Sequence, residues 1–283
     1  MRRLALLIAF LLAAAPARAA DAYASDWVKG LQSSARLIAA GGEQAGPLRA
    51  GVEITLEGKA ATYWRAPGDA GVPPLFHFGT SRNLGKVEVL YPAPQKIDES
   101  GAEIFGYQRG VIFPLRVMPA DSAQPVTLDL TLDYAACDRI CVPAQAHLTL
   151  ALPAASSPPG PHSGRIALAE AQVPRRQEIG ATAPLGLRAA TRAPLTPQGG
   201  KPGFALEIAA PDGAAVVVFP EAPDYFFLKA GPVAKAGGGI FRVLVTVEDS
   251  PKDASEVEAS FTITANGEAI EVTKRLDLGA PKP

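Results

Sequence analysis

Alternating apolar and polar positions recur along the chain and predict short β-strands with one buried face. The clearest alternation covers residues 126–134, where apolar side chains at the even positions are separated by Thr and Asp. Four further stretches are also predicted strands: 48–57, 86–91, 111–118 and 147–152. Short strands at this spacing, separated by turns that carry Pro or Gly, favour a β-sandwich.

A second set of strand patterns fills the C-terminal part of the chain. Its predicted strands are 204–208, 215–219, 241–247, 257–265 and 269–276. Asn266-Gly267 lies between the last two, and this dipeptide is typical of a two-residue hairpin turn. We therefore predict a second β-sandwich, which either positions the first or binds a partner.

The segment between the two β regions has few residues that could form a core. Residues 153–164 read PAASSPPGPHSG and are predicted to be an inter-domain linker. Residues 165–173 could then form a short helix, which Pro174 would end.

The first residues have the features of a secretory signal peptide. A basic start, Met1-Arg2-Arg3, precedes the apolar run Leu4–Ala15, and Ala17 and Ala19 supply small residues for a signal peptidase. Twelve apolar residues are too few to cross a bilayer as a helix, which needs about 20. We predict a signal peptide at 1–19, a first sandwich at 20–152, a linker at 153–164 and a second sandwich at 165–283. The mature protein is expected in the periplasm, without a membrane span.

Composition supports an all-β protein of two domains. The 283 residues include 27 Gly and 27 Pro, which argues against long helices and coiled coils. A net charge of −1 provides no broad basic surface, so nucleic acid is not an expected partner. We find no Gly-rich phosphate loop and no nucleophile–His arrangement, and the favoured chemistry needs no cofactor.

Cys137 and Cys141 are the only cysteines, and they lie between the two best-patterned strands. This places them at the end of a hairpin, where two cysteines can approach within bridging distance. In an oxidising compartment they are expected to form a disulfide. A disulfide that closes a loop of five residues adds only about 2 kcal/mol to the free energy of unfolding, which is little for a structural bridge. Other thiols can reach a disulfide in a loop, so we favour a bridge that opens and closes. A structural staple remains the alternative.

Metal binding is a further alternative for the same residues. Two thiolates with His147, six residues beyond Cys141, could hold Cu(I). The usual zinc spacing and a second ligand pair are missing, so no metal site is predicted. Because His147 alternates with inward-facing leucines, we interpret it as an exposed strand residue.

Four motifs occur in an order that resembles a known family. They are residues 62–71 (TYWRAPGDAG), residues 87–94 (VEVLYPAP), Gly106-Tyr107 and residues 132–143 (LDYAACDRICVP). They resemble the periplasmic N-terminal region of the DsbD protein-disulfide reductases, especially the copper-sensitivity suppressor (ScsB-like) branch. The resemblance covers roughly residues 45–152. DsbD itself spaces its cysteines more widely, and the shorter gap here follows the ScsB-like pattern.

The resemblance implies an immunoglobulin-like sandwich with a redox-active cysteine pair, and hence a protein-disulfide reductase component. By this analogy Cys141 attacks the incoming disulfide and Cys137 resolves the mixed disulfide. A transmembrane thiol reductase of the DsbD or CcdA type would be the electron donor. A periplasmic thioredoxin-fold protein or disulfide isomerase would be the acceptor. The chain shows no transmembrane or thioredoxin domain of its own, so the reductant is expected to be a separate protein.

The resemblance also suggests residues that shield the cysteines or dock a partner. Tyr63 and Trp64 fall where the family has aromatics near the pair, although both could equally be core residues of a strand. The family's cap loop corresponds to about residues 97–105, so Ile97 or Phe105 could shield the cysteines. Arg65 and Asp69 could form an ion pair within a turn or belong to a docking rim, and we favour the turn.

The favoured hypothesis is a periplasmic thiol–disulfide exchange protein that relays electrons through Cys137 and Cys141. One alternative is a non-catalytic scaffold with a structural disulfide. Another is a copper-stress protein that holds Cu(I) with the same cysteines.

Overall fold

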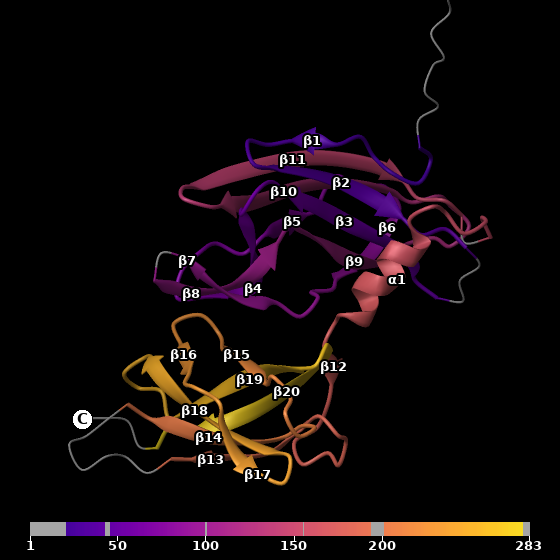
Figure 1. The fold of residues 1–283 in the computed structure, drawn as a ribbon. Helices are drawn as coiled ribbons and strands as arrows, with labels where there is room; N and C mark the ends of the chain where they lie inside the picture. The colour runs from indigo at the N-terminus through magenta and orange to yellow at the C-terminus, as the bar shows by residue number, and fades with distance from the viewer. Residues whose placement is uncertain (1–20, 43–45, 100, 155, 194–200, 280–283) are drawn as a thin grey trace, which may run out of the picture.

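Two β-sandwiches make up most of the protein, as the computed structural model in Figure 1 shows. The structure describes residues 21–279 except 43–45, 100, 155 and 194–200, so the predicted signal peptide lies outside the described residues. Within the described part of the chain, no helix is long and apolar enough to cross a membrane. The all-β prediction with two sandwiches is confirmed.

The first sandwich is formed by two antiparallel sheets that bury a common apolar core. One sheet runs in the order β1 (Val28–Lys29), β2 (Ser33–Ala39), β3 (Leu48–Leu56), β9 (Gly110–Pro119) and β6 (Leu84–Val89). The other runs in the order β11 (Cys141–Ala151), β10 (Thr127–Cys137), β4 (Ala61–Gly68), β8 (Ala102–Gln108) and β7 (Gln95–Glu99), with β5 (Leu75–His77) also paired to β10.

Strands β10 and β11 form the long hairpin that the alternating pattern predicts. They pair in register from Thr127 opposite Ala151 to Cys137 opposite Cys141. The even-numbered side chains of residues 126–134 are buried, and the Thr and Asp residues between them are partly exposed. The period-two pattern therefore predicted both the strand and its buried face.

The second sandwich repeats the architecture with different strands. One sheet runs in the order β12 (Arg175–Arg176), β20 (Glu268–Asp277), β19 (Glu256–Ala265) and β15 (Val217–Glu221). The other runs in the order β13 (Gly186–Arg192), β14 (Gly203–Ala209), β18 (Ile240–Asp249) and β16 (Phe227–Ala230), with β17 (Ala234–Gly237) also on β18. Asn266 and Gly267 both have positive φ between β19 and β20, as the expected hairpin turn requires.

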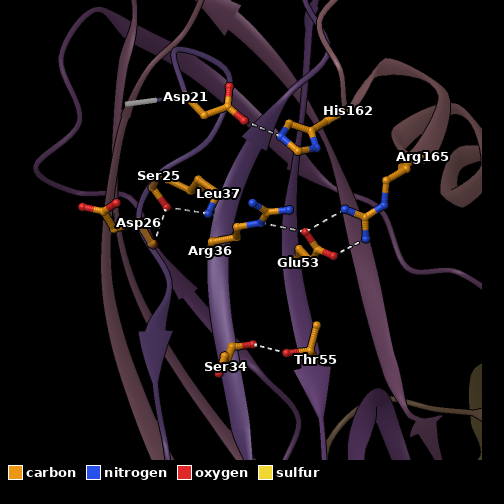
Figure 2. Close-up of polar contacts among 10 residues, drawn as sticks. All are labelled: Asp21, Ser25, Asp26, Ser34, Arg36, Leu37, Glu53, Thr55, His162 and Arg165. Carbon is orange, nitrogen blue, oxygen red and sulfur yellow. Dashed lines mark hydrogen bonds and ion pairs between the residues drawn. The ribbon is translucent and has the colours of Figure 1, made fainter. Parts of the chain in front are cut away.

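Helix α1 (Ser163–Ala171) packs on the first sandwich, although we predicted a domain boundary at residue 165. Ile166 is buried with Ile38 and Ala40. Figure 2 shows how charge reinforces this contact, because Glu53 binds both Arg36 and Arg165. Just before the helix, His162 contacts Asp21 at 3.0 Å. The helix thus continues the first sandwich rather than beginning the second.

The predicted linker is also attached to the first sandwich. The amide of Gly160 donates to the carbonyl of Ala40, and the hydroxyl of Tyr23 donates to the carbonyl of Pro158. Residues 156–162 therefore run along the surface of the first sandwich on the way to α1 instead of spacing two separate bodies.

The two sandwiches contact each other through residues of β15, β16 and β20. Phe219 of β15 packs edge-on against Trp64 and Phe105, with ring centroids 6.1 and 5.1 Å apart, and so joins the core of the first sandwich. Arg65 pairs with Glu221 and Glu271 of the second sandwich. Figure 1 shows the β15–β16 end of the second sandwich facing β4 and β8.

Asp69 pairs with Lys229 of the second sandwich at 3.0 Å. The prediction that Arg65 and Asp69 form an ion pair within a turn is therefore wrong. Each side chain reaches a partner more than 150 residues away, which the local sequence could not indicate.

Candidate functional site

Cys137 and Cys141 form a disulfide at the end of the β10–β11 hairpin. Asp138, Arg139 and Ile140 make the exposed turn, and the two Cα atoms are 4.0 Å apart. Because the two cysteines are directly opposite each other in the ladder, the hairpin itself brings their side chains together. The predicted hairpin position of the cysteines is confirmed.

The two sulfurs have different surroundings. Cys137 is 2% exposed and belongs to a small apolar cluster with Ala61, Tyr63 and Ile104. Cys141 is exposed at the first position of β11. An incoming reactant can therefore approach Cys141, whereas Cys137 is screened from solvent.

Tyr63 places its hydroxyl over both sulfurs. Ala61 of β4 pairs with Cys137, and Tyr63 follows two residues later, so strand alternation turns its ring to the same side. Its hydroxyl lies 2.9 Å from Sγ of Cys137 and 3.3 Å from Sγ of Cys141. Gly71, with φ +108°, leaves the space for the ring, because a Cβ there would lie 2.2 Å from Cε1 of Tyr63.

Glu99 is the residue of the site that the sequence did not indicate. It ends β7, and its carboxylate accepts a hydrogen bond from the Tyr63 hydroxyl at 3.1 Å. The other carboxylate oxygen is 3.5 Å from Sγ of Cys141. Residues 97–105 were expected near the cysteines, but no local pattern distinguished Glu99 from its acidic neighbours Asp98 and Glu103.

Burial raises the pKa of Tyr63, and the adjacent Glu99 carboxylate adds to that effect. The phenol therefore stays protonated at neutral pH and remains a hydrogen-bond donor. A protonated phenol can donate to Glu99 or to a sulfur, and a thiolate accepts such a bond more strongly than a disulfide sulfur.

The four predicted shielding or docking residues divide into two pairs. Tyr63 contacts the disulfide, and Ile97 packs partly buried against the cluster that contains Cys137. Trp64 and Phe105 instead face the main core, where they contact Phe219. Alternation explains the division, because neighbouring strand residues point to opposite faces of the sheet.

His147 lies outside the site. It is exposed opposite Thr131, whose hydroxyl is 3.0 Å from Nδ1 of the imidazole. Six residues of strand separate it from Cys141, which corresponds to about 20 Å. The Cu(I) arrangement in which His147 joins the two thiolates is therefore wrong, because an extended strand keeps these positions apart.

Comparison with known proteins identifies the fold around this site. Residues 32–153 match the family model described as the N-terminal domain of the thiol:disulfide interchange protein DsbD. The crystal structure of the N-terminal periplasmic domain of ScsB from Proteus mirabilis superposes with a TM-score of 0.68 at 20% identity, covering 91% of this chain and 99% of that one.

A conserved domain protein from Bacillus anthracis aligns over 89% of each chain, but at 8% identity and a TM-score of 0.24 it adds nothing to the assignment. No curated protein sequence gives a significant match. The ScsB domain shares the two-sandwich fold across nearly the whole chain. Residues 32–153, which carry the Cys137–Cys141 disulfide and make up less than half of the chain, are therefore similar to the DsbD N-terminal family.

Proposed function

We propose that the protein is a periplasmic thiol–disulfide exchange protein that relays electrons through Cys137 and Cys141. The observation that carries this proposal is the asymmetry of the disulfide. One cysteine is exposed, the other is buried, and a single tyrosine hydroxyl contacts both sulfurs. A staple needs no such asymmetry, whereas an exchange reaction uses one sulfur for attack and the other for resolution.

In the reduced protein, the Cys141 thiolate attacks a disulfide of the partner. A bond forms between Sγ of Cys141 and one partner sulfur, and the second partner sulfur leaves as a thiolate that takes up a proton. The Cys137 thiolate then attacks Sγ of Cys141, which releases the partner as a dithiol and restores the Cys137–Cys141 disulfide. Two electrons pass from this protein to the partner.

Tyr63 and Glu99 are suited to assist the two thiols. The Tyr63 hydroxyl can donate a hydrogen bond to whichever sulfur is a thiolate, because it lies near both. The Glu99 carboxylate is close enough to accept the proton of Cys141 before attack. Its negative charge opposes the thiolate, so proton acceptance is its favourable contribution.

The partners follow from the direction of electron flow that this reaction requires. The reduced pair must be regenerated by a donor, which we propose to be a transmembrane thiol reductase of the DsbD or CcdA type. The acceptor is a periplasmic thioredoxin-fold protein or disulfide isomerase. Ile97 is only partly buried beside the cluster that contains Cys137 and would contact the docked partner, whereas Tyr63, Trp64 and Phe105 are buried and would not.

Trapping a mixed disulfide tests the proposal. Cys137→Ser leaves the exposed Cys141 free to attack but unable to resolve, so it should accumulate a mixed disulfide with an oxidised thioredoxin-fold protein. Cys141→Ser is the matched control and should trap little, because the remaining thiol is buried. Equal trapping by the two variants would contradict the assigned roles, and no trapping by either would contradict exchange altogether.

A further inference from the structure

We infer that the reduced protein binds one Zn²⁺ ion through the thiolates of Cys137 and Cys141 and the carboxylate of Glu99. One ligand atom from each of these residues lies within 4.8 Å of the other two. The inference rests on this donor set, and it stands whether or not the cysteines exchange disulfides with a partner.

The three side chains converge because of the strand order rather than the local sequence. Cys137 and Cys141 face each other across the hairpin, and β4 and β8 separate that hairpin from β7, which carries Glu99. Glu99 nevertheless reaches the sulfurs from the end of its strand, at 3.5 Å from Sγ of Cys141. In a tetrahedral zinc site, Zn–S bonds of about 2.3 Å and Zn–O bonds of about 2.1 Å place sulfur and oxygen about 3.6 Å apart.

The chemistry of the donors selects zinc over the other thiophilic ion that the sequence suggested. Cu(I) favours soft sulfur ligands and gains little from a carboxylate, whereas Zn²⁺ binds both thiolate and carboxylate oxygen. Two thiolates and one carboxylate also carry three negative charges, which suits a divalent cation better than a monovalent one. Three protein ligands leave a fourth position open to water, because Cys141 is exposed.

Tyr63 holds the carboxylate in place. Its hydroxyl donates to one oxygen of Glu99, and the other oxygen points toward Cys141. Such a contact fixes the orientation of a ligand, so Tyr63 would support the site without binding the ion. Because a disulfide sulfur is not a thiolate ligand, oxidation of Cys137 and Cys141 removes the site and releases the ion.

Titration of the reduced protein tests the site. We would reduce the mature protein, remove the reductant without oxygen, and add Zn²⁺ in competition with a chromophoric chelator. We expect one ion per reduced chain and none per oxidised chain. Replacing either cysteine by Ser should abolish this binding, and Glu99→Gln should weaken it by at least about tenfold, since a charged ligand is lost.

Asp98→Asn is the matched control, because Asp98 precedes Glu99 on the same hairpin and its side chain is not one of the three ligands. It should bind Zn²⁺ as the unaltered protein does. Co²⁺ in place of Zn²⁺ should give thiolate charge-transfer absorption and the strong visible bands of a four-coordinate ion.

Three results would overturn the inference. Reduced protein that does not compete with the chelator has no zinc site. Equal affinities of Glu99→Gln and the unaltered protein would remove Glu99 from the ligand set. Tight Cu(I) binding that is indifferent to Glu99→Gln, without Zn²⁺ binding, would make the cysteines a two-thiolate chelator for a soft ion instead.

Discussion

The two sandwiches share a fold plan but differ in what their surfaces carry. The first has both cysteines of the chain, with Tyr63 and Glu99 beside them. The second has no Cys, Trp or His from residue 165 onward, and its described core is built of aliphatic and Phe side chains. The chemistry therefore belongs to one hairpin end and its neighbouring strands, and the sandwich itself does not confer it.

The second sandwich is in contact with the strands of the first sandwich that carry the site. Phe219 contacts Trp64 of β4 and Phe105 of β8 in the core of the first sandwich. Strand β4 also carries Tyr63, and β8 pairs with β7, which ends at Glu99. The second sandwich thus packs on the strands that position the site, from the opposite face. Four predictions test this division between chemistry and support.

The largest effect is expected from the cysteines. Cys137→Ser with Cys141→Ser should reduce disulfide exchange to the uncatalysed rate, because no sulfur remains to react. The free energy of unfolding should fall by only about 2 kcal/mol, the contribution of a bridge that closes five residues. Exchange assays and urea unfolding measure the two effects. A variant that cannot fold would instead make the bridge a structural staple.

Phe219→Ala should destabilise the protein by about 3–5 kcal/mol, because it empties a space lined by Trp64 and Phe105 of the other sandwich. Tryptophan fluorescence during unfolding follows the first sandwich, since Trp64 is fully buried beside the cavity. Phe261→Ala is the control within the second core, and it should leave the emission of Trp64 in the folded protein unchanged. If Phe219→Ala also leaves that emission unchanged, the two cores are independent.

Glu53→Gln should lower the free energy of unfolding by about 3 kcal/mol at neutral pH, because it leaves Arg36 and Arg165 without their buried carboxylate. Burial opposes the charge of Glu53, but the two arginines lower its pKa below 4.5 overall. A carboxyl group whose pKa is lower in the folded state stabilises the fold at pH values above its unfolded-state pKa. This contribution is lost as the pH falls through the folded-state pKa.

The difference in the free energy of unfolding between Glu53→Gln and the unaltered protein should therefore become smaller below about pH 4.5. Unfolding experiments at several pH values would measure this difference. Glu88→Gln is the control, since Glu88 forms an exposed pair with Arg116 and should change stability by less than about 1 kcal/mol. A constant difference down to pH 2 would contradict the role of the Glu53 charge.

Tyr63→Phe should have the smallest effect. The variant loses a hydrogen bond that favours the thiolate, so the reduced form loses about 1 kcal/mol of stabilisation. The reduction potential should therefore become more negative by about 20 mV. The pKa of the reactive thiol should rise for the same reason. Tyr225→Phe, at an exposed position of the second sandwich, should change neither quantity. A shift toward positive potential would contradict the proposed hydrogen bond.

Local patterns predicted the parts of the fold in which one strand face is buried. The β10–β11 hairpin and the turn at Asn266-Gly267 are such cases, because neighbouring residues alone determine both the alternation and the type of turn. Strand β4 escaped prediction because Tyr63 and Trp64 are both buried, on opposite faces, so no alternation is visible.

Spacing and periodicity predicted only the cysteines of the site; the family resemblance added Tyr63 and Ile97, and nothing indicated Glu99. Tyr63 and Glu99 are 74 and 42 residues away from the sulfurs that they approach, and strand order alone brings them there. Likewise, the partners of Arg65 come from another sandwich. Contacts of this kind depend on tertiary topology, which neither spacing nor periodicity encodes.

The reduction potential of the Cys137–Cys141 disulfide tests the central claim most directly. The mature protein would be equilibrated in thiol buffers of known potential, and its free thiols would be trapped and counted by mass. An exchange protein predicts a value between about −120 and −270 mV, within the range of known thiol–disulfide oxidoreductases. A disulfide that stays closed below about −300 mV would be a structural staple and would contradict the electron relay.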